Sequence, residues 1–223
     1  MKSFISEDDI EQALLKKLKE APFNYDVILC NPSLEAQDNP DNGPHRDSVD
    51  QCVLPTILYD SLIKLNPNVS KEKIQETVKN LSKNFTDKDI VETNYKLYQM
   101  IREKIKITEK RNGKEEFDFI NLIDFENPEN NNFTAVSQMW IKGTFGRPDV
   151  LIFVNGLPLV FIELKNETVK IQEAFTKNLT DYKKIIPNIF AFNQICVLSN
   201  GRETRIGAFN ADYEFFFQWL KPT

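Results

Sequence analysis

Two acidic residues and one lysine in the second half of the sequence have the types and spacing that phosphodiester hydrolysis requires. Asp149 follows Arg147-Pro148, while Glu163 and Lys165 lie two residues apart in an otherwise apolar run. Side chains two apart on a β-strand point to the same face of a sheet. Clustered carboxylates repel each other unless a cation joins them, and Mg²⁺ prefers oxygen ligands. A lysine beside the cation can orient the attacking water and stabilise negative charge on the phosphate.

A structural explanation of the same residues stays open. Glu163 and Lys165 could be strand-end charges that reach solvent, or an ion pair without chemistry, as most isolated Glu-x-Lys pairs are. That explanation accounts neither for Asp149, which follows Arg147-Pro148, nor for the turn that brings the chain back from Asp149 to Glu163.

The segment between the carboxylates predicts a β-hairpin. Val150–Val154 and Leu159–Lys165 are apolar, β-branched runs on either side of Asn155-Gly156. A two-residue turn at Asn155-Gly156 would set Asp149 opposite Ile162, on the wrong face for a site shared with Glu163. A shared face therefore requires a three-residue loop, or a two-residue turn corrected by a β-bulge.

Further elements are predicted around this hairpin. A capping box at Ser6 and Asp9 predicts a first helix of about three turns, and the polar residues 31–47 predict a loop. Helical patterns cover about 53–65, 71–82, 88–104 and Val169 to Ile185. Strands are predicted at Ile105–Lys110, Glu116–Phe125, Phe133–Ile141, Phe190–Leu198 and Thr204–Phe209, turns at Asn112-Gly113 and Ser199–Arg202, and an aromatic segment that packs on the core at Tyr213–Leu220.

These elements predict an α/β fold, with a mixed central sheet flanked by helices. We expect one domain over residues 1–223, with a catalytic core of about 1–30 and 105–215 and a helical elaboration over about 50–105. No run of about 18 apolar residues is present, and the N-terminus has no signal-peptide pattern. We therefore expect a cytoplasmic protein that has no membrane partner.

Histidine and cysteine content excludes several kinds of catalytic site. The sequence has one histidine, His45, in a polar stretch that predicts a surface loop. Ser/His triads, multi-histidine zinc sites and HNH or HD hydrolase chemistry all need histidine at the reacting centre. Cys30, Cys52 and Cys196 are too scattered for a CxxC metal site and suit free thiols in a reducing compartment. Catalysis would therefore depend on carboxylates, lysine and a metal bound by oxygen.

Charge is distributed unevenly along the chain. Residues 1–141 carry 18 Lys and Arg against 25 Asp and Glu, a balance of −7, whereas residues 142–223 carry 10 against 8, a balance of +2. An acidic first half repels DNA, so tight independent binding of DNA is not expected. If DNA is the substrate, another domain or subunit is expected to hold it.

The sequence resembles a known family of nucleases. Pro148-Asp149 with Glu163-Leu164-Lys165 matches the PD-(D/E)xK nuclease motif. The sequence from Arg147 to Asn166 resembles the corresponding segment of the restriction (motor) subunits of type I restriction enzymes. Further resemblance lies in Leu65-Asn66-Pro67, Asn121–Phe125, Asn127-Pro128 and Ser199–Arg202. The chain is identified as similar to the N-terminal nuclease domain of that subunit.

The resemblance implies roles for individual residues. Asp149 and Glu163 correspond to metal ligands, the carbonyl of Leu164 to a further ligand, and Lys165 to the catalytic lysine. Glu11 matches an acidic residue that such nucleases often carry on the first helix, although a solvated glutamate on a charged helix is the ordinary alternative. The family's Gln-x-x-x-Tyr element corresponds to Asn178 and Tyr182 here. Asn is one methylene shorter than Gln, and Tyr182 could equally be a core residue.

The resemblance also implies the function and the partners. The expected activity is Mg²⁺-dependent cleavage of double-stranded DNA within a restriction complex. The expected partners are specificity and methyltransferase subunits and the subunit's own ATP-driven translocase domains. The sequence has no GxxxxGK[ST] phosphate loop and ends at Lys221-Pro222-Thr223, so those translocase domains, and any need for ATP, are expected to lie outside it. The alternative function is a degenerate nuclease fold that acts only as an assembly or DNA-guiding module.

Overall fold

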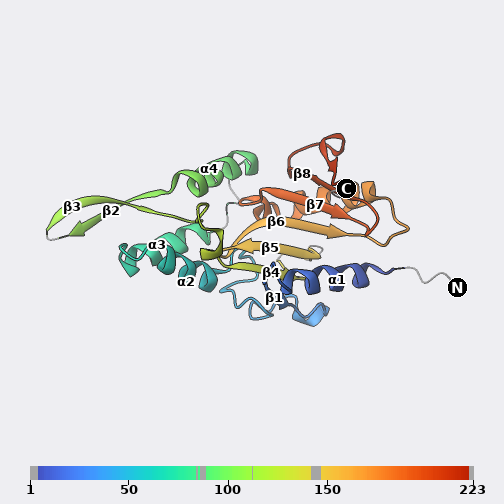
Figure 1. Ribbon diagram of the computed structural model, residues 1–223, viewed down its shortest axis with the longest axis horizontal. Coiled ribbons are helices and arrows are strands. Elements are labelled where there is room, and N and C mark those ends of the chain that lie inside the picture. Colours follow the sequence, from blue (N-terminus) through green and yellow to red (C-terminus); the bar gives the residue numbers. More distant parts are fainter. Residues whose placement is uncertain (1–4, 84, 86–88, 112, 142–146, 221–223) are drawn as a thin grey trace.

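A seven-stranded mixed sheet lies at the centre of the computed structural model, which describes residues 5–83, 85, 89–111, 113–141 and 147–220 (Figure 1). The strand order is β1-β4-β5-β6-β7-β8-β9, in which β1 pairs with β4, and β6 with β7, in parallel, and the other neighbours are antiparallel. The strands are β1 Asp26–Leu29, β4 Phe133–Ser137, β5 Val150–Val154, β6 Leu157–Leu164, β7 Ile195–Ser199, β8 Thr204–Gly207 and β9 Phe217–Gln218. The predicted α/β class with a mixed central sheet is confirmed.

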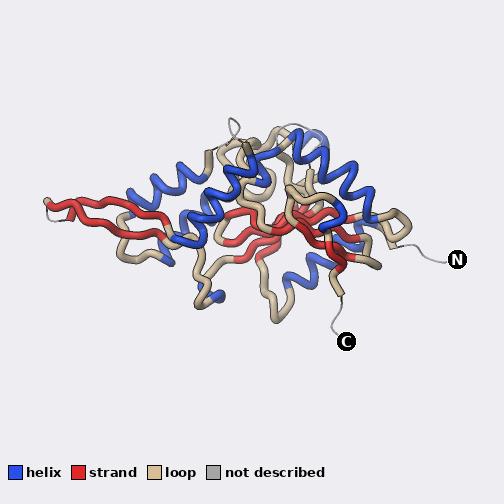
Figure 2. Tube along the Cα trace, turned by 90° about the horizontal axis from the view of Figure 1, so that it is seen from above, coloured by secondary structure: helices blue, strands red, loops and turns tan. Residues whose placement is uncertain are grey.

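Helices cover both sides of the sheet (Figure 2). Alternate residues of β5 divide between the two sides, because successive side chains on a strand point in opposite directions. Val150 and Ile152 pack in a cluster with Leu15 of α1 (Glu7–Lys19), whereas Leu151 and Phe153 pack in a second cluster with Leu179. The continuous apolar sequence of β5 is thus explained by burial on both faces.

The first helix begins as predicted. Ser6 accepts a hydrogen bond from the Asp9 backbone N–H, and the Asp9 side chain accepts one from the Ser6 backbone N–H, which completes the capping box.

Three helices of the first half pack around a separate part of the core. They are α2 Pro55–Leu65, α3 Lys71–Leu81 and α4 Ile90–Glu103, which confirms the three helical patterns predicted there. Pro55 lies in the first turn of α2, where its missing N–H leaves no helical hydrogen bond unmade. Leu58, Ile74 and Leu97 meet in one buried cluster. Among the described helices, none combines the length and the apolar character needed to cross a bilayer.

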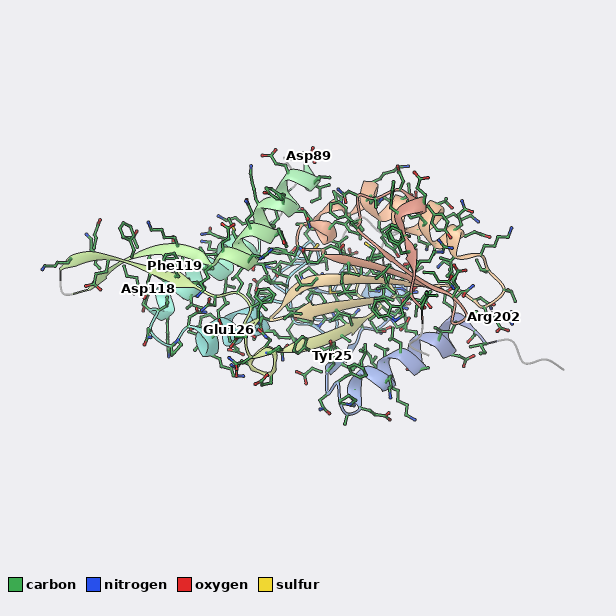
Figure 3. The ribbon with its side chains drawn as sticks, turned by 45° about the horizontal axis from the view of Figure 1, so that its top comes forward. Tyr25, Asp89, Asp118, Phe119, Glu126 and Arg202 are labelled. Carbon is green, nitrogen blue, oxygen red and sulfur yellow. The ribbon has the colours of Figure 1, made fainter. Side chains whose placement is uncertain are left out.

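Two strands form an arm that projects from the body of the molecule (Figure 1). This β2–β3 arm consists of β2 Ile105–Arg111 and β3 Lys114–Ile120, and Asn112 of the predicted turn lies outside the described residues. The strand predicted to run to Phe125 ends at Ile120, because side chains replace its sheet partners: Asn66 Oδ1 accepts from the Asn121 N–H. Phe119 and Asp118 lie on this arm, at the opposite end of the molecule from Arg202 (Figure 3).

Several predicted boundaries are wrong. β4 ends at Ser137 rather than Ile141, because Gln138 has a φ of 57° and leaves the extended conformation. The helix predicted from Val169 to Ile185 is divided into α5 Ile171–Glu173, the π-helical segment η3 Ala174–Leu179 and α6 Thr180–Ile185. The strand predicted from Phe190 begins at Ile195, β8 ends at Gly207, and β1 was not predicted. Short 3₁₀ turns occupy η1 Leu34–Ala36, η2 Pro128–Asn130, η4 Pro187–Phe190 and η5 Tyr213–Phe215.

The aromatic C-terminal segment packs on the core through Tyr213 and Phe216. Phe216 is fully buried, but Phe215, Phe217 and Trp219 are exposed. The prediction that Tyr213–Leu220 docks on the core is therefore correct for Tyr213 and Phe216 and wrong for the other aromatic residues, which lie on or near the short edge strand β9.

Candidate active site

The β5–β6 hairpin brings Asp149 and Glu163 opposite each other. Val154 pairs with Leu157 across a two-residue turn, but Ile152 pairs with Val160 and Val150 with Ile162. The register shifts because Leu159 is an extra residue on β6, and continuing the shifted register sets Asp149 against Glu163. The second of the two predicted arrangements, an even turn corrected by a bulge, is thus confirmed.

The turn of this hairpin is buried and held by asparagine side chains. Asn155 and Gly156 both have positive φ, as a tight two-residue hairpin requires. The Asn155 amide donates to the Leu122 carbonyl at 2.9 Å, and its Oδ1 accepts from the Asn132 N–H at 2.7 Å. The Gly156 carbonyl accepts from the Leu54 N–H, next to the start of α2. Elements that resemble the restriction family, far apart in the sequence, therefore meet at this end of the hairpin.

Asp149 lies at the other end of the hairpin, buried at 8% exposure. Its Oδ2 accepts a 2.6 Å hydrogen bond from the Leu164 backbone N–H. Burial raises the pKa of Asp149 to about 6, against the lowering effects of that hydrogen bond and of the Lys165 charge.

Glu163 is buried more deeply, at 1% exposure. Burial, and then the negative charge of Asp149, raise its pKa to about 8, although Lys165 acts in the opposite direction. One carboxylate oxygen, Oε1, accepts from Lys165 Nζ, while the other, Oε2, is buried and has no hydrogen-bond partner among the described residues. An unpartnered buried carboxylate oxygen is costly and indicates a site for a cation or a donor.

Lys165 occupies the space beside these carboxylates. Its Nζ donates to Glu163 Oε1 and to the Leu164 carbonyl, each at 2.8 Å, and lies 3.7 Å from Glu7 Oε1. Burial lowers the pKa of this amine, but the surrounding carboxylates, Glu163 foremost, outweigh burial and raise it. The Leu164 carbonyl, a candidate metal ligand, is therefore engaged by the lysine.

Glu11 lies close to the same group from helix α1. Glu11 is 4% exposed, which rules out the alternative that it is a solvent-exposed glutamate on a charged helix. Its Oε1 accepts from the Ser137 hydroxyl at 2.7 Å, and its Oε2 accepts from the Gln138 side-chain amide. Both partners lie at the end of β4, so Glu11 ties α1 to the sheet beside Asp149.

Glu7 was not predicted from the sequence. It lies one helical turn before Glu11, and that spacing of four residues was the available signal. Glu7 and Glu11 line a cavity of about 490 Å³ together with Gln12, Ser137, Gln138 and Arg147; we call this cavity the α1 cleft. Arg147 is held there by a 2.7 Å hydrogen bond to the Pro32 carbonyl and lies over the Trp140 ring.

Tyr182 and Asn178 lie on the helical segment that covers the face of the sheet opposite α1, the face to which Asp149 and Glu163 belong. Tyr182 is buried, with its ring edge-on to Phe161 at 5.3 Å between centroids. Burial, followed by the charges of Glu163 and Asp149, raises the pKa of its hydroxyl above the ordinary value. Asn178 is half-buried at the π-helical segment, and both residues line a cavity of about 390 Å³. The structure thus gives Tyr182 a packing role beside the carboxylates.

The turn after β7 adjoins Leu164 and Lys165 of the candidate site. Ser199 pairs with Leu164, and its carbonyl accepts from the Lys165 N–H at 2.8 Å. Gly201, with a φ of 79°, lies against Ile10 of α1. The predicted Ser199–Arg202 turn therefore supports Leu164 and Lys165 from the neighbouring strand.

The histidine and the cysteines do not form a metal site within the described residues. His45 is exposed, 4.0 Å from Asp41, and the three cysteines are free and buried. Across the described ranges, no three His, Cys, Asp or Glu side chains form a ready-made metal cluster. Any metal at Asp149 and Glu163 would thus need water or substrate oxygens to complete its shell, as Mg²⁺ commonly does.

Comparison with known proteins assigns the family. The model of the type I restriction enzyme R protein N terminus matches residues 4–215. The chain is 32% identical over 221 residues to the type I restriction enzyme HindI endonuclease subunit of Haemophilus influenzae, a match that covers 96% of this chain and 20% of that protein. It is 38% identical over 112 residues to the EcoprrI endonuclease subunit of Escherichia coli, covering 46% of this chain and 36% of that protein. The chain spans about a fifth of the length of the first relative and about a third of the second. Since the family model matches nearly the whole chain, the protein belongs to the type I restriction enzyme R protein N-terminus family.

Proposed function

We propose that this chain is the nuclease module of a type I restriction enzyme and that it cleaves double-stranded DNA with Mg²⁺. The observation that carries the proposal is the buried group of Asp149, Glu163 and Lys165, in which Glu163 Oε2 has no hydrogen-bond partner among the described residues. The family and the names of the relatives, which are endonuclease subunits, support the same conclusion.

The donor set fits a hard divalent cation. Asp149 and Glu163 offer carboxylate oxygens, and burial makes their negative charges unfavourable without a cation. Two carboxylates leave room for waters and for phosphate oxygens, which suits Mg²⁺. When bound, such a cation would supply Lewis acidity and a more acidic water.

The protein residues would divide the remaining work. Asp149 and Glu163 would hold the cation, and the Leu164 carbonyl could join them once Lys165 Nζ moves away from it. Lys165 would orient the attacking water and stabilise negative charge on the phosphate. The Leu164 N–H keeps Asp149 Oδ2 in place.

Three further residues would assist. Glu11 is placed to hold a water in the α1 cleft or to add negative charge near Asp149. Tyr182 would support Glu163 from the helix that covers the same face of the sheet, and Asn178 lines the cavity beside it, where a DNA strand could lie.

The grip on DNA would come from other parts of the enzyme. The first 141 residues carry a balance of −7, which opposes binding of a polyanion. We propose that the ATP-driven translocase domains of the subunit, with specificity and methyltransferase subunits, hold the duplex.

One observation favours a second function. Lys165 Nζ donates to Glu163 and to the Leu164 carbonyl and lies 3.7 Å from Glu7, as an ion pair without chemistry would. A degenerate nuclease fold that only guides DNA or supports assembly would keep this arrangement.

A single substitution separates the two functions. In the assembled restriction complex, Lys165→Ala should abolish DNA cleavage while ATP-driven translocation continues. Lys79→Ala, an exposed lysine on α3, is the matched control and should cleave like wild type. Wild-type cleavage by Lys165→Ala would favour the non-catalytic module.

A further inference from the structure

The ammonium of Lys165 has three hydrogens and two close acceptors. Both acceptors, Glu163 Oε1 and the Leu164 carbonyl, belong to groups that the proposed function assigns to the cation. The side chain of Lys165 is only 14% exposed, so water cannot readily replace a lost acceptor. Binding of a cation would therefore leave a buried ammonium that needs another anion.

Glu7 is the remaining carboxylate within ion-pair distance among the described residues. Its Oε1 lies 3.7 Å from Lys165 Nζ, just beyond hydrogen-bond distance. It is 44% exposed, and no other ion pair or hydrogen bond of its side chain is present within the described structure, so it is free to move closer. The capping box at Ser6 and Asp9 fixes the adjacent backbone, which confines that movement to the side chain.

Resting on the proposed function, we propose that Glu7 is a positioning residue that takes over the Lys165 ammonium when Glu163 turns to a divalent cation. Glu7 would thereby hold Nζ at the mouth of the α1 cleft. The lysine would then face the water and phosphate without drifting into solvent or back onto Glu163.

A crystal structure of this chain with Mn²⁺ gives a readout independent of activity. We expect an ion between Asp149 and Glu163, and Lys165 Nζ within about 3.2 Å of a Glu7 carboxylate oxygen. An ion with Nζ still on Glu163 Oε1 would overturn the role of Glu7 alone. No ion between the two carboxylates would overturn the proposed function and this inference with it.

Kinetics of DNA cleavage by the assembled complex provide the second measurement. Glu7→Gln should lower kcat about three- to tenfold with little change in KM, because the lysine acts after DNA binds. Glu7→Asp should restore part of the loss, since it keeps the charge. Glu20→Gln, the same change at the other end of α1 where the side chain is exposed, should cleave like wild type. Wild-type kcat in Glu7→Gln, or no rescue by Asp, would contradict the proposal.

Discussion

Asp149 accepts a 2.6 Å hydrogen bond from the backbone N–H of Leu164, the residue that separates Glu163 from Lys165. The bond joins the residue before β5 to the last residue of β6. One carboxylate therefore sets the position of the strand end that carries the other two charged groups. Loss of the Asp149 side chain should disturb Glu163 and Lys165 as well as any metal.

Stability without divalent cations should fall as pH rises. In the folded chain the pKa of Glu163 is raised to about 8 and that of Asp149 to about 6, so folding favours their protonated forms. Their favourable contribution is complete below the unfolded values near 4 and is lost as pH rises through 6 and 8. We expect the free energy of unfolding to drop by about 1–3 kcal/mol between pH 5 and 8.5.

Urea unfolding in EDTA at the two pH values measures this drop. In the double variant Asp149→Asn with Glu163→Gln, the free energy of unfolding should fall much less between the two pH values. Adding Mg²⁺ to the wild-type chain at pH 8.5 should recover the lost stability. Carboxylates with lowered pKa values, such as Asp124, lose their contribution at more acidic pH and do not interfere. Equal slopes in wild type and double variant would refute the assignment.

Gly156→Ala should destabilise the chain far more than Gly113→Ala. Both glycines have similar positive φ, 81° and 77°. A Cβ at Gly156 would lie 2.6 Å from the Leu54 carbonyl oxygen and 2.7 Å from the Leu58 nitrogen, whereas one at Gly113 meets nothing within 4 Å. We expect the free energy of unfolding, measured by chemical denaturation, to fall by about 2–4 kcal/mol in Gly156→Ala and by about 1 kcal/mol in Gly113→Ala. Equal losses would mean that α2 yields to the new methyl group.

Glu11→Gln separates a catalytic role from a structural one. The amide keeps the shape of Glu11. Its oxygen can still accept from the Ser137 hydroxyl, and its NH₂ can donate to Gln138 Oε1, which has no partner among the described residues, once the Gln138 amide turns over. Stability should therefore change by no more than about 1 kcal/mol. Cleavage by the assembled complex should fall about tenfold or more if the charge is used. Glu20→Gln serves again as the control. Unchanged cleavage with reduced stability would assign Glu11 to the fold alone.

This chain by itself should bind duplex DNA weakly. Its net charge of −5 leads us to expect a Kd of about 10⁻⁴–10⁻⁶ M at physiological salt, the range of non-specific contacts. Fluorescence anisotropy with a labelled duplex measures it. Nanomolar binding would show that this chain does not depend on other domains for its grip.

Local signals in the sequence predicted much of the fold and the core of the candidate site. The capping box of α1 and the three helices of the first half depend on contacts between residues one or two helical turns apart. Because these residues are close together in the sequence, the helices could be predicted from it. The hairpin at Asn155-Gly156 was predicted from the two apolar runs beside it. Strand parity then required a three-residue loop or a bulge if Asp149 and Glu163 were to share a face, and the structure has the bulge. Their roles in catalysis stay a prediction, as do the domain boundaries.

Other features depend on partners far along the chain. Arg46 lies in the polar loop predicted over residues 31–47, yet it is 2% exposed because it donates to the Trp140 carbonyl. The burial of Glu11 requires Ser137 and Gln138, and the contact of Glu7 with Lys165 requires α1 to lie beside β6. β1 is four residues long and gains its identity only by pairing with β4, about 108 residues later.

The extra residue at Leu159 restricts how the segment between the carboxylates can change during evolution. Removing that one residue, or adding one elsewhere in the hairpin, would turn Asp149 and Glu163 to opposite faces of the sheet. Insertions and deletions between them should therefore be tolerated only in compensating pairs. If an alignment of distant relatives places a one-residue gap in this segment, it implies that one of the two carboxylates points to the other face of the sheet in those relatives.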